Sequence, residues 1–137
     1  MSTRRLEPGE PLPSWLRALD ETTFGEAWGE PESHEAIWMI EPAAFARWSL
    51  VPPAREAELL RIAVETSQRG QGLACALLGV CEAELAAMGI RELHLEVRVS
   101  NATARALYTG ADWGESGLRQ NYYRDGEDAV LYTKRIG

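Results

Sequence analysis

The stretch Arg69 to Ala74, Arg-Gly-Gln-Gly-Leu-Ala, lies where an apolar run gives way to a helical pattern. Backbone N–H groups at a helix start can bind phosphate, because the positive end of the helix dipole lies there. Arg69 would add a charge-assisted contact. The chain lacks both the three-glycine Rossmann fingerprint and the Gly-Lys-Ser/Thr of a Walker loop. We predict a pyrophosphate-binding turn, although Gly70 and Gly72 could equally serve only a tight connection.

Three polar side chains further along the chain are candidates for proton transfer and ligand contact. Glu96 lies near the C-terminal end of an expected strand, where open α/β sheets bind ligands. On a largely covered sheet face this carboxylate could act as a general base; a solvated or ion-paired glutamate beside Arg98 is the alternative. Asn101 and Tyr108 are two helical turns apart and share a helix face, although a helix cap and a core tyrosine would explain them separately. His94 is assigned a supporting, structural role.

The elements that must position these residues form an expected strand–helix–strand unit. Glu58–Val64 is apolar on both faces apart from Arg61, which is typical of a central strand. A helix starts near Gly72 and ends at Gly89. Its apolar stripe comprises Ala74, Leu77, Leu78, Cys81, Leu85 and Met88. Arg91–Val97 alternates cleanly, so a right-handed crossover should make the two strands parallel.

The residues before this unit predict an arm, a helix and a strand pair. Residues 1–13 are rich in proline, glycine and charge and predict a loose N-terminal arm. Ser14 predicts the N-cap of a helix that runs to about Leu19, with a continuation that uses Phe24 and Trp28 as apolar anchors. Ala36–Ile40 and Ala44–Val51 predict two antiparallel strands.

After the unit, Ser100–Asn101 predicts the cap of a second helix that carries Tyr108. Trp113 begins a poorly periodic strand. Asp128–Arg135 predicts a last strand that pairs with residues 121–123.

The composition restricts the class of protein. The chain has 137 residues, which is enough for one domain over residues 1–137, and a formal net charge of −7. This acidity argues against general nucleic-acid binding and suits a basic partner. Cys75 and Cys81 point in different directions on one helix, so we expect no disulfide between them, and no zinc spacing is present. The absence of a membrane-length apolar run and of a secretory signal predicts a cytoplasmic protein without membrane contacts.

Taken together, these residues resemble the GCN5-related N-acetyltransferase superfamily, and within it the bacterial ribosomal-protein S18 alanine N-acetyltransferases. The superfamily loop pattern Arg/Gln-x-x-Gly-x-Gly/Ala is met by Arg69 to Ala74. Further matches keep the order and spacing of the subgroup over about residues 57–133. They are Leu95–Arg98, Ser100–Asn101, Ala106–Tyr108, Asn121–Tyr123 and Glu127–Ala129.

The resemblance implies a fold and a role for each matching residue. The fold is α/β (α+β), a mixed central sheet of about six to seven strands flanked by helices, with a βαβ core that binds acetyl-CoA. Glu96 would be the general base and Tyr108 the general acid. Ile62, Ala63 and Val64 would offer backbone groups to the pantetheine arm, and Asn101 would contact coenzyme A. The pyrophosphate would be surrounded by Arg69, Gly70, Gln71, Gly72, Leu73, Ala74 and Cys75.

The expected activity is transfer of acetyl from acetyl-CoA to an N-terminal α-amine of a protein, with ribosomal protein S18 as the preferred partner. The expected protein uses no metal and is a monomer or a weak dimer. An arginine-rich S18 would suit the acidic surface. A small-molecule amine acetyltransferase and a non-catalytic acyl-CoA-binding regulatory module are the alternatives, and acetylation of aminoacyl-tRNA is disfavoured by the net charge.

Overall fold

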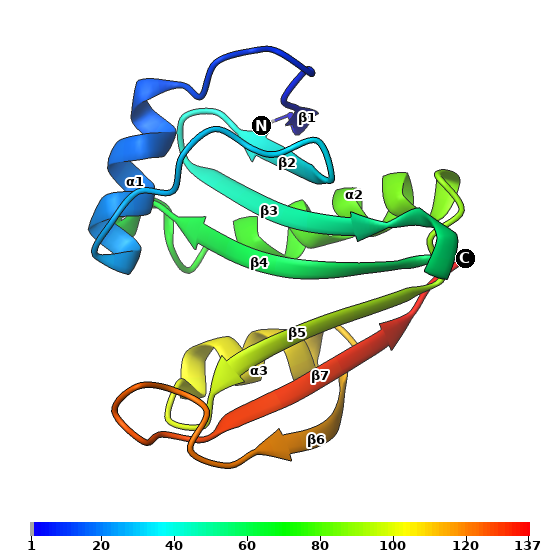
Figure 1. Cartoon of the computed structure of the whole chain (residues 1–137). Coiled ribbons are helices and arrows are strands. Elements are labelled where there is room, and N and C mark those ends of the chain that lie inside the picture. Colours follow the sequence, from blue (N-terminus) through cyan, green and yellow to red (C-terminus); the bar gives the residue numbers. More distant parts are fainter. Residues whose placement is uncertain (1) are drawn as a thin grey trace.

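The computed structural model describes residues 2–137, which form a seven-stranded mixed sheet with three α-helices (Figure 1). The strands are β1 (Arg4–Arg5), β2 (Glu35–Ile40), β3 (Ala44–Val51), β4 (Glu56–Val64), β5 (Glu92–Arg98), β6 (Gly114–Arg119) and β7 (Ala129–Arg135). The helices are α1 (Ser14–Phe24), α2 (Leu73–Ala87) and α3 (Ala102–Gly110). The strand order is β1-β2-β3-β4-β5-β7-β6. The mixed sheet with flanking helices confirms the predicted fold class.

The predicted strand–helix–strand unit is confirmed as β4–α2–β5. β4 lies between β3 and β5, and β4 and β5 are parallel, whereas the other neighbouring strands are antiparallel. Leu93, Leu95 and Val97 are buried on one face of β5, and the alternating residues are only half-buried. Glu96 therefore points to the opposite face from the buried leucines, as the alternation predicts.

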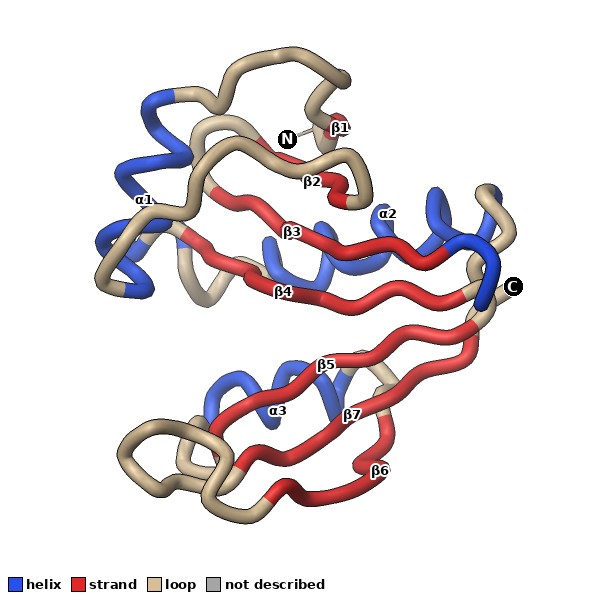
Figure 2. The backbone as a smooth tube through the Cα atoms, viewed as in Figure 1, coloured by secondary structure: helices blue, strands red, loops and turns tan. Residues whose placement is uncertain are grey.

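β4 and β5 pair along only part of their length and then diverge. Their register runs from Glu56 opposite Glu92 to Glu58 opposite His94 and goes no further. In β4, Leu60 is an extra residue, because Arg47 of β3 pairs with Arg61 and the next residue of β3 pairs with Leu59. Bulges bend a strand and end its pairing. Figures 1 and 2 show the resulting opening between β4 and β5.

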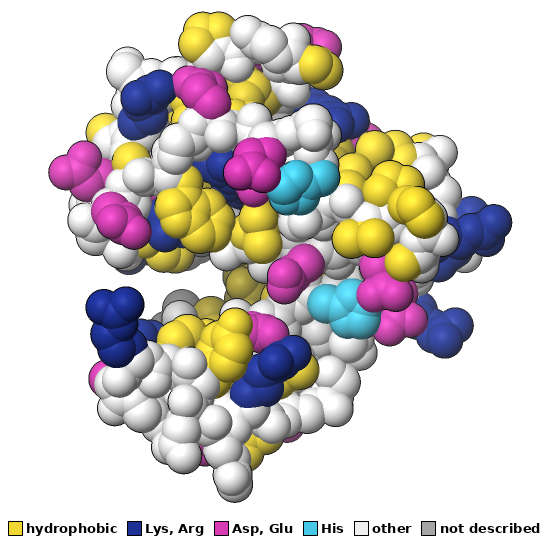
Figure 3. Space-filling view, viewed as in Figure 1, with side chains coloured by type: hydrophobic (Ala, Val, Ile, Leu, Met, Phe, Trp, Pro, Cys, Tyr) yellow, Lys and Arg dark blue, Asp and Glu magenta, His cyan; other side chains and the backbone are white. Residues whose placement is uncertain are grey.

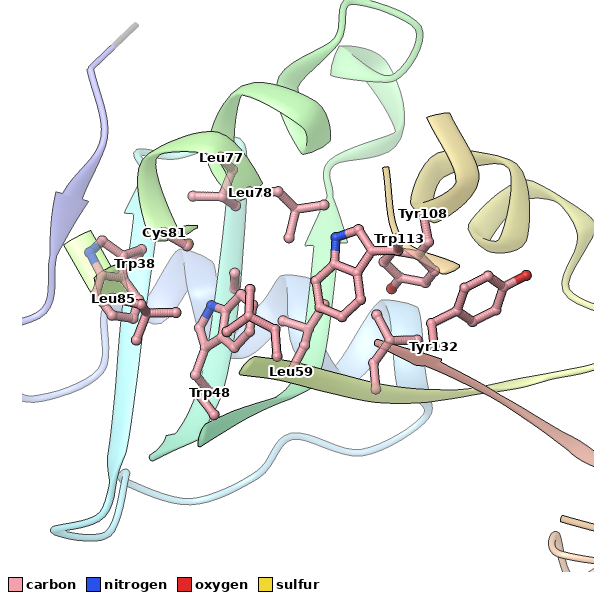
Figure 4. Packing of buried hydrophobic residues seen from close by; sticks show 14 of the residues in the cluster. Trp38, Trp48, Leu59, Leu77, Leu78, Cys81, Leu85, Tyr108, Trp113 and Tyr132 are labelled. Carbon is pink, nitrogen blue, oxygen red and sulfur yellow. The ribbon is translucent and has the colours of Figure 1, made fainter. Parts of the chain in front are cut away.

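Two apolar clusters hold the sheet, one on each face. The larger lies under α2 and α3 and includes Trp48 and Trp113, whose rings stack with centroids 6.5 Å apart (Figure 4). The smaller packs α1 and the N-terminal segment against β2, β3 and β4 through residues such as Leu16 and Phe45. Because each strand of this half buries both faces, α1 and α2 are fixed on opposite sides of the sheet.

The N-terminal prediction of a loose arm is wrong. Arg4–Arg5 forms the edge strand β1 beside β2, and Leu6 and Leu12 are buried in the smaller cluster. The buried leucines hold the segment in place despite its charged, proline-containing composition. The cap prediction for Ser14 is also wrong, because Pro13 occupies the N-cap position without a side-chain hydrogen bond.

Two other predictions differ from the structure. Met88, expected on the buried stripe of α2, follows the helix and is 45% exposed. β7 does not pair with residues 121–123, which lie in a loop after β6. Instead β7 pairs with both β5 and β6. Its seven residues pair with β5 along the whole of Glu92–Arg98.

Within residues 2–137, none of the helices has the length and hydropathy needed to cross a membrane.

Candidate functional site

The diverging ends of β4 and β5 open into a cavity of about 750 Å³. Figure 3 shows the surface hollowed between the part that carries α1 and the part that carries β5 to β7. Twelve of the thirteen predicted site residues line this cavity, and Gln71 does not. They are Ile62, Ala63, Val64, Arg69, Gly70, Gly72, Leu73, Ala74, Cys75, Glu96, Asn101 and Tyr108.

The β4 wall of the cavity presents backbone polar groups. The Glu65 N–H donates to the Ala43 carbonyl across the β3–β4 pair. Because hydrogen-bonded and non-hydrogen-bonded pairs alternate along an antiparallel ladder, Ala63 also bonds to β3, whereas Ile62 and Val64 direct their N–H and C=O groups to the cavity. Both backbone groups of Ile62 and the N–H of Val64 are therefore free to pair with an extended ligand, whereas the Val64 carbonyl accepts from Arg69 and the backbone of Ala63 bonds to β3.

The loop before α2 forms the end wall. Gly70 and Gly72 have φ values of 81° and 76°, in the left-handed region that favours glycine. Among the described residues 2–137, the backbone N–H groups from Gly70 to Cys75 have no hydrogen-bond acceptor. The Arg69 Nε donates to the Val64 carbonyl at 3.0 Å, which ties the loop to the end of β4. This is the arrangement of donors that binds a phosphate.

Glu96 lies at the opposite wall, on the face of β5 that α2 and α3 leave open. The expectation of a largely covered sheet face is therefore wrong for this part of the sheet: nearby His94 is 34% and Glu56 is 44% exposed. Glu96 is nevertheless only 21% exposed, because Arg119 and Tyr122 cover it. The Arg119 Nε lies 3.2 Å from the Glu96 Oε1.

Tyr108 reaches the cavity from α3, on the other face of the sheet. The Asn101 side chain caps α3 by accepting from the Ala104 N–H at 3.1 Å, as the sequence predicts. The Tyr108 ring packs against Trp113 and Tyr132, each with centroids 5.8 Å apart (Figure 4). Burial raises the pKa of the Tyr108 phenol to about 12, so the hydroxyl stays protonated at neutral pH.

Aromatic residues that the sequence did not single out for the site line the cavity mouth. Phe24 and Trp28 lie there, on either side of the α1 C-terminus. The Arg61 guanidinium stacks on the Trp28 ring at 3.7 Å from its centroid and pairs with buried Asp20 at 2.7 Å. The backbone N–H of Trp28 donates to the same carboxylate at 2.9 Å. In the sequence, the signal for these contacts was Arg61 itself, a single arginine in an apolar strand, because a buried cation needs a carboxylate or an aromatic ring beside it.

Neither the acidic residues nor the cysteines form a metal centre within residues 2–137. No group of three or more His, Cys, Asp or Glu is placed to hold an ion there. Cys75 and Cys81 are both free thiols, one exposed and one buried, which confirms that they do not pair.

A family model for the acetyltransferase (GNAT) family matches residues 2–111. The chain belongs to this family. The match includes β4, α2, β5 and the whole of α3, so the family domain contains most of the described cavity. The resemblance in the sequence is confirmed.

Relatives of this chain carry more specific names. The [ribosomal protein bS18]-alanine N-acetyltransferase of Escherichia coli K12 is 46% identical over 97 residues, 69% of this chain and 64% of that protein. An N-alpha-acetyltransferase of Saccharolobus solfataricus is 38% identical over 86 residues, 60% of this chain and 50% of that protein. The chain thus spans less than two thirds of the length of these curated relatives. The crystal structure of the Escherichia coli ribosomal-protein-S18-alanine N-acetyltransferase superposes with a TM-score of 0.81 at 32% identity, covering 99% of this chain and 94% of that one.

Proposed function

We propose that this GNAT protein transfers acetyl from acetyl-CoA to the N-terminal α-amine of a protein, with the N-terminal alanine of ribosomal protein bS18 as its acceptor. The observation that carries the proposal is the single cavity that brings together the amide loop, Glu96 and Tyr108. The names of the relatives support the acceptor. The same proposal locates the enzyme in the cytoplasm, where ribosomal proteins are made.

The proposed binding mode of acetyl-CoA follows from the two walls already described. The pyrophosphate would accept hydrogen bonds from the N–H groups of Gly70 to Cys75 and would face the positive end of α2. The pantetheine arm would pair with Ile62 and Val64 as an added strand in the gap beside β4. The thioester would then reach the point where β4 and β5 diverge, between Glu96 and Tyr108.

The proposed reaction moves two protons. Glu96 takes a proton from the acceptor ammonium, directly or through one water, which leaves the amine lone pair free to attack. A C–N bond forms at the thioester carbon and the C–S bond breaks as the tetrahedral intermediate collapses. Tyr108 donates its proton to the departing thiolate, and the second proton of the acceptor nitrogen passes through solvent to restore the phenol, which leaves a neutral amide and coenzyme A. An α-amine, with a pKa near 8, gives up its proton at neutral pH more easily than a lysine.

The test is mass spectrometry of peptides incubated with the protein and acetyl-CoA. A peptide with the N-terminal sequence of bS18 is expected to gain one acetyl group on its α-amine. The same peptide with a blocked α-amine and an internal lysine should gain none. A panel of small amines, read by thiol release, is the comparison. Acetylation of small amines without transfer to the peptide would reject the acceptor and retain the acetyltransferase.

A further inference from the structure

A second, smaller cavity adjoins Glu96 on the open face of the sheet. It has a volume of about 320 Å³ and lies over the paired ends of β4 and β5, with β7 and β6 along its other side. Glu96 lines both cavities, so it lies where they meet. Glu58, His94 and Arg119 also line the smaller one.

Glu58 and Glu96 project into this cavity from neighbouring strands. Glu58 is opposite His94, and Glu96 follows two residues later on the same face of β5. Among residues 2–137, Glu58 has no ion-pair or side-chain hydrogen-bond partner, and it is half-buried. Burial, and after it the negative charge of Glu96, raises the pKa of Glu58. Two carboxylates in such a space cannot both ionise without cost unless a cation is close.

Arg119 supplies that cation from two strands away. β7 separates β5 from β6, and Leu131 of β7 pairs with Glu96 on one side and with Gly117 on the other. Since Gly117 has no side chain, the long side chain of Arg119 can extend over β7 to the Glu96 carboxylate, at 3.2 Å. Among the described residues that line the smaller cavity, Arg119 is the one permanent cation.

The remaining groups that face Glu96 do not replace Arg119. The phenol of Tyr122 faces Glu96, and a side-chain hydrogen bond to Glu96 followed by its negative charge raises the pKa of Tyr122. Burial, and with it the negative charge of Glu96, raises the pKa of Tyr123. His94 pairs with Glu56 at 2.9 Å. At neutral pH these two phenols carry no charge. Arg98, on the same face of β5, pairs with Asp125 at 2.9 Å and with Glu127 at 3.1 Å instead of Glu96.

We propose that Arg119 is a positioning residue for the reaction, because its ion pair holds Glu96 ionised and oriented beside the competing carboxylate of Glu58. This inference rests on the proposed function, in which Glu96 takes the amine proton. Without Arg119, the two carboxylates would share a proton at a higher pH, and Glu96 would be blocked as a base. Arg119 is 56% exposed, so its effect is reduced by solvent.

The test is the pH dependence of kcat/KM in four variants. In Arg119→Gln the acid limb is expected to move up by about half to one pH unit, which is a roughly three- to tenfold loss below the midpoint of the limb and almost none well above it. Arg119→Lys should restore the limb, because it restores the charge. Adding Glu58→Gln to Arg119→Gln should also restore it, because it removes the competitor. Arg124→Gln, which removes an exposed cation from the same segment, should leave the profile unchanged.

Two results would overturn the inference: an Arg119→Gln profile that superposes on that of the wild type, or an equal loss at every pH. The proposed function fails separately, if the wild type transfers no acetyl or if Glu96→Gln keeps full activity. The inference also has a readout without turnover. In a ¹³C NMR titration, assigned with Glu96→Gln, the midpoint of the Glu96 carboxyl should rise in Arg119→Gln. An unchanged midpoint would reject the role of Arg119 whatever the acceptor.

Discussion

The two walls of the larger cavity are made of different parts of the chain. The β4 and α2 wall presents backbone groups, at Ile62, Val64 and the glycine loop. The β5 and α3 wall presents the side chains of Glu96 and Tyr108. A wall of backbone groups tolerates changes of side chain as long as its φ and ψ values persist. A wall of side chains loses its function when a single atom, such as a hydroxyl oxygen, is removed or replaced. Binding and catalysis should therefore respond to different kinds of substitution.

The largest expected effect is on the side-chain wall, in Glu96→Gln. Without the base that we propose, kcat should fall by about 10²- to 10⁴-fold, with little change in the KM for acetyl-CoA. Steady-state kinetics with the bS18 peptide checks this. Glu92→Gln is the matched control, because Glu92 lies on the same face of β5 outside the cavity. A comparable loss of kcat in Glu92→Gln would show that removal of any negative charge from β5 lowers activity, and it would contradict the role of Glu96.

The next effect is expected in Tyr108→Phe, which removes only the hydroxyl. Loss of the proposed proton donor should lower kcat by about ten- to a hundredfold, which is the lower end of the range for general acid catalysis. The ring contacts with Trp113 and Tyr132 should persist, so the melting temperature should change little. Tyr132→Phe removes a hydroxyl from the same aromatic cluster but outside the larger cavity, and it should keep kcat. Equal losses in both variants would contradict the assignment.

The backbone wall should respond to glycine substitution. Gly72→Ala forces a Cβ into a left-handed conformation, although no atom lies within 4 Å of that Cβ. It should destabilise the fold by about 1 kcal/mol and raise the KM for acetyl-CoA several-fold, with kcat largely kept. Gly79→Ala, inside α2 and equally uncrowded, should instead stabilise by about 0.5–1 kcal/mol. Chemical denaturation of the two variants measures the cost of backbone strain, and the KM for acetyl-CoA measures the loss of binding.

The smallest expected effect is on stability at alkaline pH. The folded-state pKa of Tyr108 is raised to about 12 from its ordinary 10, so folding favours the protonated phenol. This stabilisation is complete below pH 10 and is lost as the pH rises toward 12. At pH 11 the wild type should have lost about 1 kcal/mol more than Tyr108→Phe, relative to pH 9. Urea denaturation at both pH values checks this, and parallel losses would contradict it.

The sequence was sufficient for features that depend on near neighbours along the chain. Period-two alternation placed Glu96 opposite the buried leucines, and the cap at Asn101 followed from a short polar side chain before an apolar period. Gly70 and Gly72 identified the loop because few other residues adopt its backbone conformation.

Features that depend on distant pairing were missed. Nothing near β7 indicates that it inserts between β5 and β6, because strand order is decided by burial over the whole sheet. The contact between Arg119 and Glu96 depends on that insertion, and it joins residues with a third strand between them. The packing of the N-terminal segment likewise needed the partner cluster under α1.

The bulge at Leu60 also shifts the alternation of side chains along β4 by one residue. Before it, odd-numbered Ala57 and Leu59 face the larger cluster; after it, even-numbered Ile62 and Val64 do. The side chains of β4 thus alternate between the two faces of the sheet in two phases, one before Leu60 and one after it. If Leu60 paired with β3 without a bulge, the first phase would run through to the end of the strand. Arg61 would then point into the larger apolar cluster, and the backbone groups that now face the cavity would turn toward β3.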